Sequence, residues 1–197
     1  MNILAKTLLA TSFLALALPA GAAFADATVK LSIAGEAYDG PPAFQISMGG
    51  KVIGKGVLDK AISTETVGRL FASAKPASYL QEFTFTIPER QFKPDASISV
   101  ILTNDKYRDE EIGRDRNLFV QSITVNGQEV DAAQLILTVS DKPEIIDFQA
   151  GYLPVYQTRD AAVAEPPAGG WPLVDVGVDQ AMVTPVRVTI TPLPVAQ

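Results

Sequence analysis

Short segments in which apolar and polar residues alternate recur from residue 28 onwards. In each of them every second side chain is apolar, which is the period of a β-strand with one buried face. No window of about a dozen residues shows a helical period of similar strength. The pattern predicts strands over 28–33, 44–48, 82–87, 97–103 and 119–125.

Two of these strands run directly into strong turn signals. Gly49-Gly50 follows the strand at 44–48 and precedes a return strand that begins at Val52, while Asn126-Gly127 follows the strand at 119–125. Such dipeptides are typical of two-residue β-hairpins. Many short strands separated by turns predict an all-β fold, a β-sandwich or jelly roll with two packed sheets around one core.

Other parts of the chain give weaker signals. A faint helical stripe occurs within 59–77, which we expect to be an insertion of one or two helical turns or an irregular loop. Segments 135–139 and 182–190 are strand-like, and 160–172 is rich in Ala, Pro and Gly, which is typical of a linker or surface loop. We expect Trp171 to anchor that loop onto the core. Residues 26–130 are therefore predicted to form the β-sandwich, and 131–197 a C-terminal β extension.

The first 25 residues have the order of a signal peptide. Lys6 is followed by an apolar run over 7–18, and Ala23-Phe24-Ala25 places small residues where signal peptidase cleaves. The run is shorter than the about 20 residues that a membrane-spanning helix needs. We expect residues 1–25 to be removed after Ala25, no membrane insertion after that cleavage, and a periplasmic or secreted protein.

Composition narrows the chemistry. The chain has no Cys, hence no disulfide framework, and no His. Without His the commonest general base and nearly all zinc sites are excluded, which leaves carboxylates, Tyr and Lys. The net charge of −6 disfavours nucleic acid and anionic membranes as partners, because both reward clustered Lys and Arg. An acidic chain is compatible with cations or neutral sugars.

One segment, 104–117, departs from the rhythm of strands and turns. It holds five carboxylates and four basic residues between two predicted strands. Calcium, which takes about six to eight oxygen ligands, would relieve the repulsion between the acids. The charge pattern alone favours a simpler interpretation, a solvated loop whose acids and bases neutralise one another. The segment is not an EF-hand, since Tyr107 and Glu110 stand where a carboxylate or amide and then a glycine belong.

Several short motifs follow one another in a characteristic order. They read AYDGPPAFQI at 37–46, GGKVIG at 49–54, FTF at 83–85, VILTND at 100–105, GRDRNLFV at 113–120 and VNG at 125–127. Together they resemble the calcium-dependent xylan-binding family of carbohydrate-binding modules. The strongest markers are the Asn-Asp pair, the Asp-Arg-Asn triplet and the Val-Asn-Gly turn. The resemblance covers about residues 28–130.

The resemblance implies a small β-sandwich in which calcium lies in a loop cleft at one end and sugar hydroxyls coordinate the metal directly. Carried over position by position, Asp105 and Asp115 match metal-ligand positions. Asp39 lies in the other loop that lines such a cleft. Family members often have an acid just before the strand at 44–48, where this chain has Pro41-Pro42-Ala43. Because loops at one end of a sandwich converge, we expect Asp39 to face Asp105 and Asp115.

Four residues beside these acids are candidate ligand-binding residues. Tyr38 and Tyr107 would each offer an aromatic face to a sugar ring, and each is equally well explained as an ordinary amphipathic residue at the rim. Asn104 and Asn117 belong to the two motifs that contain the predicted metal ligands.

The leading hypothesis is calcium-dependent binding of a polysaccharide, xylan-like or another β-linked glycan, by a protein that is not an enzyme. The alternative is a structural envelope β-sandwich whose calcium stiffens loops and whose partner is another protein. A glycosidase with two catalytic carboxylates is disfavoured. Metal-ligand acids are ionised, whereas a glycosidase needs one carboxyl that stays protonated.

Overall fold

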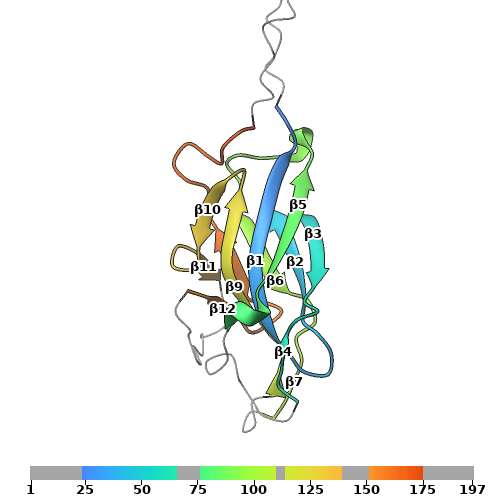
Figure 1. Cartoon of the computed structure of the whole chain (residues 1–197). Coiled ribbons are helices and arrows are strands. Elements are labelled where there is room, and N and C mark those ends of the chain that lie inside the picture. The colour runs from blue at the N-terminus through green and yellow to red at the C-terminus, as the bar shows by residue number, and fades with distance from the viewer. Residues whose placement is uncertain (1–23, 66–75, 110–113, 139–150, 175–197) are drawn as a thin grey trace, which may run out of the picture. The chain divides into compact units, whose positions relative to one another are not determined.

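The described structure consists almost entirely of β-strands arranged in two packed sheets (Figure 1). The computed structural model describes residues 24–65, 76–109, 114–138 and 151–174. All of them belong to one compact unit, Phe24–Gly177. The prediction of an all-β sandwich is confirmed.

The first sheet is built around two long antiparallel strands. Its members are β1 (Ala27–Ala37), β4 (Ile62–Ser63), β5 (Gln81–Ile87), β9 (Asn117–Val125), β10 (Gln128–Asp131) and β12 (Leu153–Val155). The central strands β1 and β9 pair with each other. β10 and β12 pair with the two halves of β9, and β5 and β4 pair with the two halves of β1. Only the short β1–β4 pair is parallel among these pairings.

The second sheet is antiparallel throughout its described strands. It consists of β2 (Ala43–Met48), β3 (Lys51–Val57), β6 (Ile98–Leu102), β11 (Ile136–Thr138) and β13 (Ala161–Ala164), in the order β11-β13-β6-β2-β3. Outside the two sheets lie a small strand pair, β7 (Tyr107–Asp109) and β8 (Arg114–Asp115), and two 3-10 turns, η1 (Pro76–Tyr79) and η2 (Glu89–Gln91).

Alternating apolar side chains fill the space between the sheets, as the sequence predicts. Val29, Leu31 and Ile33 of β1 are fully buried and belong to the same cluster as Ile46 and Val100 of the other sheet. Burial of an aliphatic side chain of this size stabilises the fold by about 1.5–3 kcal/mol. Period-two patterning therefore determines both the strands and the face that each turns inward.

Two glycines let the sandwich close along the edge where β3 and β5 meet. A Cβ on Gly54 would collide with the ring of Phe85, and a Cβ on Gly56 would lie 2.5 Å from the ring of Phe44. Phe44 in turn packs edge-to-face on Phe83, with ring centroids 4.8 Å apart. The absent side chains make room for the ring of Phe85 from the opposite sheet and for the ring of Phe44 from the neighbouring strand β2.

The expectation of a linker or surface loop over 160–172 is wrong for its first part. β13 lies inside the second sheet between β11 and β6, with Ala162 and Ala164 fully buried in the core. Alanine has little intrinsic preference for strands, so local sequence gives no signal here. Pairing on both edges decides the conformation instead.

The predicted role of Trp171 as an anchor is confirmed. Its side chain is 2% exposed and belongs to the main core cluster. The indole Nε1 donates to Ala96 O at 2.7 Å, and the Trp171 backbone N donates to Pro94 O at 2.7 Å. The Pro/Gly-rich segment is thereby fixed against the connection between β5 and β6.

Several predicted features lie outside the described residues. These are the leader up to residue 23, most of the helical stripe within 59–77, and the strand at 182–190. The described ends of the 59–77 segment contain β4 and the turn η1. No helix in the described ranges is long and apolar enough to cross a membrane.

Candidate functional site

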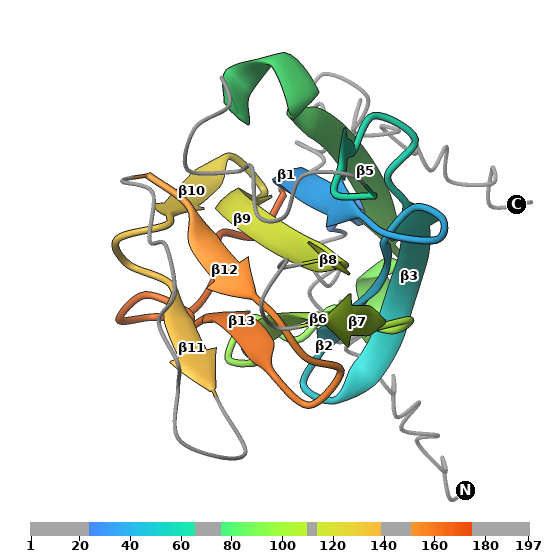
Figure 2. The ribbon, with the colours of Figure 1, turned by 90° about the horizontal axis from the view of Figure 1, so that it is seen from below.

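Three connections come together at one end of the sandwich, which we call the loop end. β1 and β6 end here, β2 and β9 begin here, and β12 leads into β13. The segments 38–42, 103–109, 114–116 and 156–160 therefore lie at this end. Figure 2 looks directly at it, with β7 and β8 nearest the viewer.

The side chain of Arg116 joins two of these connections. Its Nη2 donates to Tyr38 O at 2.7 Å and also to Asp39 O, and its Nε donates to Gly40 O at 3.2 Å. Its Nη1 donates to Asn104 O, at the end of β6. Arg116 is 6% exposed. One buried guanidinium thus binds three consecutive carbonyls of the β1–β2 loop and one carbonyl of the next connection.

Asn104 holds the other half of the same loop. Its Oδ1 accepts from Ala43 N at 2.7 Å, and its Nδ2 donates to Pro41 O at 3.0 Å. Leu58 N donates to Pro42 O at 3.0 Å. The carbonyls from residue 38 to residue 42 are consequently all hydrogen-bonded, so the β1–β2 loop is pre-organised by side chains and backbone outside it.

Three acidic side chains form one electrostatic group at the loop end. Asp115 and Asp160 are 8% and 7% exposed, and Asp105 is half-buried. The pKa of Asp105 is raised to about 6, chiefly by burial and also by the charges of Asp115 and Asp160, while the charge of Arg116 opposes the rise. A half-buried carboxyl group whose pKa is raised by burial and by neighbouring carboxylates is a candidate for a metal or functional site.

The backbone of Asp115 is held by a buried threonine. Thr64 is fully buried, and its Oγ1 accepts from Asp115 N at 3.2 Å and lies 2.9 Å from Asp115 O. The Asp115 Oδ1 accepts from Arg116 N at 2.8 Å. The backbone of Asp115 is therefore fixed by the segment that follows β4, and its carboxylate accepts from the amide of the next residue.

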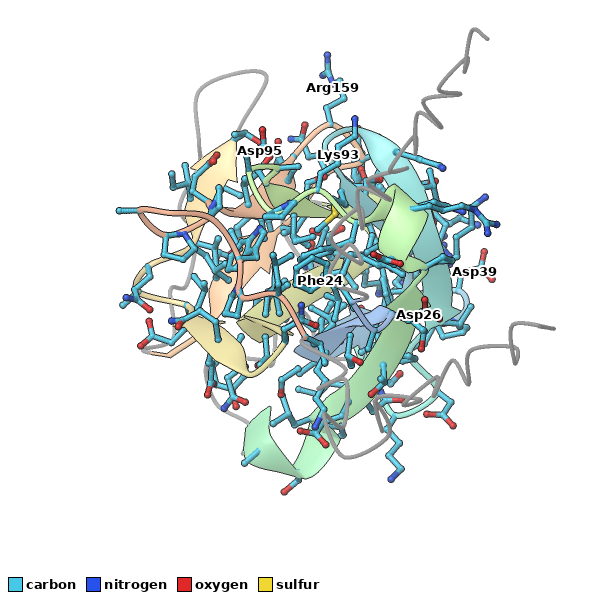
Figure 3. All side chains as sticks on the ribbon, turned by 90° about the horizontal axis from the view of Figure 1, so that it is seen from above. Phe24, Asp26, Asp39, Lys93, Asp95 and Arg159 are labelled. Atoms are coloured by element: carbon cyan, nitrogen blue, oxygen red, sulfur yellow. The ribbon has the colours of Figure 1, made fainter. Side chains whose placement is uncertain are left out.

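Asp39 takes a different place. Its carboxylate binds the ammonium group of Lys106, which lowers its pKa, and its side chain is 62% exposed. Its backbone has a φ of 47°, and its N–H donates to Glu65 Oε1 at 2.6 Å. Figure 3 shows Asp39 at the margin of the domain. The structure brings Asp105 and Asp115 into one electrostatic group and leaves Asp39 outside it, on the rim.

The four candidate ligand-binding residues differ in how far their side chains are exposed to solvent. Tyr107, on β7, is 66% exposed and lies opposite Asp115 in the small strand pair. Tyr38 is 7% exposed, which places it inside the domain instead of at the rim. Asn117 is fully buried, and its Nδ2 donates to Glu36 Oε2 at 2.8 Å. Of the four, Tyr107 alone presents its side chain broadly to solvent. The side chain of Asn104 is hydrogen-bonded to the β1–β2 loop and to Ala43.

Sequence reasoning missed two residues of the loop end. Arg116 lies within the Asp-Arg-Asn motif, and its position between two motif residues is the signal that was available for it. Asp160 gives no local signal, because it precedes an alanine-rich segment. It reaches the site only because β12 pairs with β9 and β13 pairs with β6.

The donor set suits a hard cation in its chemistry. Oxygen ligands from carboxylates, carbonyls and water are what calcium prefers. Within the described ranges, no three acidic side chains lie close enough to hold one ion together. Two carboxylates, with a third nearby and further oxygens from carbonyls, water or ligand, are the arrangement that these residues offer.

A separate cleft of about 440 Å³ lies beside the β1–β2 loop. Pro41 and Leu58 contribute to its apolar wall, and Asp59 and Glu65 add carboxylates. None of the three grouped acids lines it, so the cleft is distinct from the acidic group.

Comparison with known protein families assigns this chain to a family. The CBM60 family, described as Ca-dependent carbohydrate-binding module xylan-binding, matches residues 28–138, more than half of the chain. The protein belongs to this family. The match includes Asp39, Asp105 and Asp115 and ends before Asp160.

Two solved structures show weaker similarity. One, "vCBM60 in complex with galactobiose", is 17% identical, with a TM-score of 0.38 over 69% of this chain and 94% of that chain. The other, a selenomethionine form of vCBM60 described under circular permutation between two calcium-dependent families, is 16% identical, with a TM-score of 0.38 over 71% and 90%. Similarity at this level does not define the fold, which follows from the strand pairing. A comparison with curated proteins gives no match.

Proposed function

We propose that this protein binds a polysaccharide, xylan or another β-linked glycan, at the loop end through a calcium ion. Asp105 and Asp115 hold the ion, Asp160 adds negative charge nearby, and sugar hydroxyls fill positions that the protein leaves open. The observation that supports the proposal is the group of three acids, two of them buried, in a chain of the Ca-dependent xylan-binding family.

Physical chemistry favours a divalent cation here. The charges of Asp115 and Asp160 oppose ionisation of Asp105, and the N–H groups of Arg116, whose charge favours it, are used by backbone carbonyls. A bound cation would keep Asp105 ionised near neutral pH, against the effect of burial. The exposed ring of Tyr107 offers a flat apolar face beside Asp115 for a sugar ring.

Binding, and not hydrolysis, is the proposed activity. The family consists of binding modules. Carboxylates that serve as metal ligands are ionised, whereas glycoside hydrolysis needs one carboxyl to remain protonated as the acid. The glycan is therefore expected to leave the protein unchanged.

The deciding experiment measures retention on immobilised xylans and other β-linked polysaccharides, with calcium and with chelator. Wild-type protein should be retained with calcium and released by chelator. Asp115→Asn should abolish retention, because it removes one of few charged ligands without a change in side-chain size. The matched control is Asp95→Asn at the opposite end of the sandwich (Figure 3), which should bind as wild type does.

Calorimetric calcium titration separates the alternatives. Retention that survives chelator would show that the metal is not the bridge to the sugar. Calcium binding without retention on any glycan would support the alternative, a structural envelope sandwich with calcium-stiffened loops and a protein partner.

We further propose that the protein acts in the periplasm or outside the cell, after cleavage behind Ala25. The order of charge, apolar run and small residues in the leader supports this. Mass spectrometry of the native protein should find Asp26 at its N-terminus. An intact Met1 in a cytoplasmic fraction would refute it.

A further inference from the structure

The side chain of Arg116 contacts both connections that the proposed site needs. Its hydrogen bonds reach residues 76 to 78 positions earlier in the chain and one residue 12 positions earlier. Through them the β1–β2 loop, which carries Asp39, is tied to the end of β6, next to Asp105. The adjoining Asp115 carboxylate accepts the Arg116 backbone N–H.

The charge of Arg116 works against a metal at this position. A guanidinium within the electrostatic range of Asp105 repels a divalent cation that the same carboxylate attracts. If charge were its whole contribution, removal of Arg116 would tighten calcium binding. The four carbonyls it binds point to another contribution, which depends on the shape of the guanidinium.

We propose that Arg116 is a positioning residue. Its planar fork fixes the β1–β2 loop against the start of the 103–116 connection, and calcium and glycan affinity depend on that geometry. This rests on the proposed function. Arginine presents five N–H donors in a fixed plane, whereas lysine offers a point charge on a flexible stem, so lysine keeps the charge and loses the fork.

The test compares Arg116→Met with Arg116→Lys in calcium titrations of the full chain, followed by glycan retention. Both variants should bind calcium about 10- to 100-fold more weakly than wild type, the usual loss when a partner behind the ligands is removed. Arg90→Met, an exposed arginine of η2 at the opposite end, is the matched control and should leave the affinity unchanged. Tighter binding by Arg116→Met, or wild-type affinity in Arg116→Lys, would overturn the proposal in favour of charge alone.

A second variant covers the case in which the Arg116 variants do not fold. Gly40 has a φ of 107°, and a Cβ on it would lie 3.4 Å from the Arg116 Nη2. Because side chains rarely tolerate this φ, Gly40→Ala should strain the loop that Arg116 holds and weaken calcium binding. Wild-type affinity in Gly40→Ala would count against a need for this loop geometry.

Hydrogen exchange keeps this inference separate from the proposed function. The amides of Asp39 and Ala43 are hydrogen-bonded in the loop that Arg116 holds. In calcium-free protein they should exchange at least about tenfold faster in Arg116→Lys than in wild type, since the loop opens more often. Failure of the wild-type protein to bind calcium would contradict the proposed function but not the positioning role of Arg116. Unchanged exchange in the variant would sink the positioning role alone.

Discussion

The two ends of the sandwich are held together by different means. At the end opposite the loop end, the β2–β3 and β9–β10 turns use Gly50 and Gly127, with φ of 79° and 87°. Asn126 in the second turn accepts from Thr28 N at 2.8 Å. At the loop end, by contrast, Arg116 and Asn104 bind carbonyls of the β1–β2 loop through their side chains.

This difference between the two ends indicates which of them can carry a binding site. Short turns such as these take their shape largely from the positive φ of their own residues. A loop whose carbonyls are bound by distant side chains is pre-organised without being short, so it can present acids and an exposed tyrosine to a ligand. We call the end opposite the loop end the plain end. Substitutions at the plain end should therefore alter stability alone, and substitutions at the loop end should alter binding.

The largest expected effect on stability is at the plain end. Trp171→Ala removes a side chain that is 2% exposed and its hydrogen bond to Ala96 O. The free energy of unfolding should fall by about 3–5 kcal/mol, as for other buried aromatic deletions. Urea unfolding measures the loss, and calcium affinity of the folded fraction should remain as in wild type. A strong loss of affinity would break the separation between the two ends.

A smaller effect on stability, with a larger effect on binding, is expected from Asn104→Ala. The substitution leaves Pro41 O and Ala43 N without the side chain that binds them, which should lower the free energy of unfolding by about 1–3 kcal/mol. Glycan retention should weaken at the same time. The matched variant Asn104→Asp keeps the acceptor for Ala43 N and loses the donor, so intermediate values are expected. Full retention in Asn104→Ala would contradict the role given to the loop.

The acidic group predicts a distinctive pH dependence. Burial raises the pKa of Asp105 from 3.8 to about 6, so between these values the folded chain holds a proton that the unfolded chain releases. The stability from this group is present below pH 3.8 and is lost as pH rises through about 6. In chelator, the free energy of unfolding of wild type relative to Asp105→Asn should therefore decline across this window. With calcium the decline should disappear, because metal binding favours the ionised carboxylate. A flat difference in chelator would mean that Asp105 is less buried than the structure has it.

The smallest effect is expected from Gly50→Ala. A Cβ on Gly50 meets no atom within 4 Å, so only the positive φ opposes the substitution. The free energy of unfolding should fall by about 1 kcal/mol. Thermal unfolding measures it, and retention on glycan should equal that of wild type. A change in retention would show that the two ends are coupled through the sheets.

Much of the fold could be predicted from the sequence because strands and turns are local. The alternation of Val29, Leu31 and Ile33 determines a strand and its buried face, and Asn126-Gly127 determines a turn by its backbone preferences. The motifs around Asp105 and Asp115 were likewise enough to assign the family that the comparison shows. Each of these signals lies within a few neighbouring residues.

Tertiary structure alone decided the rest. Ala161–Ala164 is a strand because partners on both edges pair with it, and that pairing carries Asp160 to the loop end. The ion pair with Lys106 placed Asp39 on the rim. Arg116 binds Tyr38 O across 78 positions of chain. Contacts over such separations depend on how two sheets pack and on which loops then meet. No period or local motif encodes them, because the residues involved become neighbours only once the core has formed.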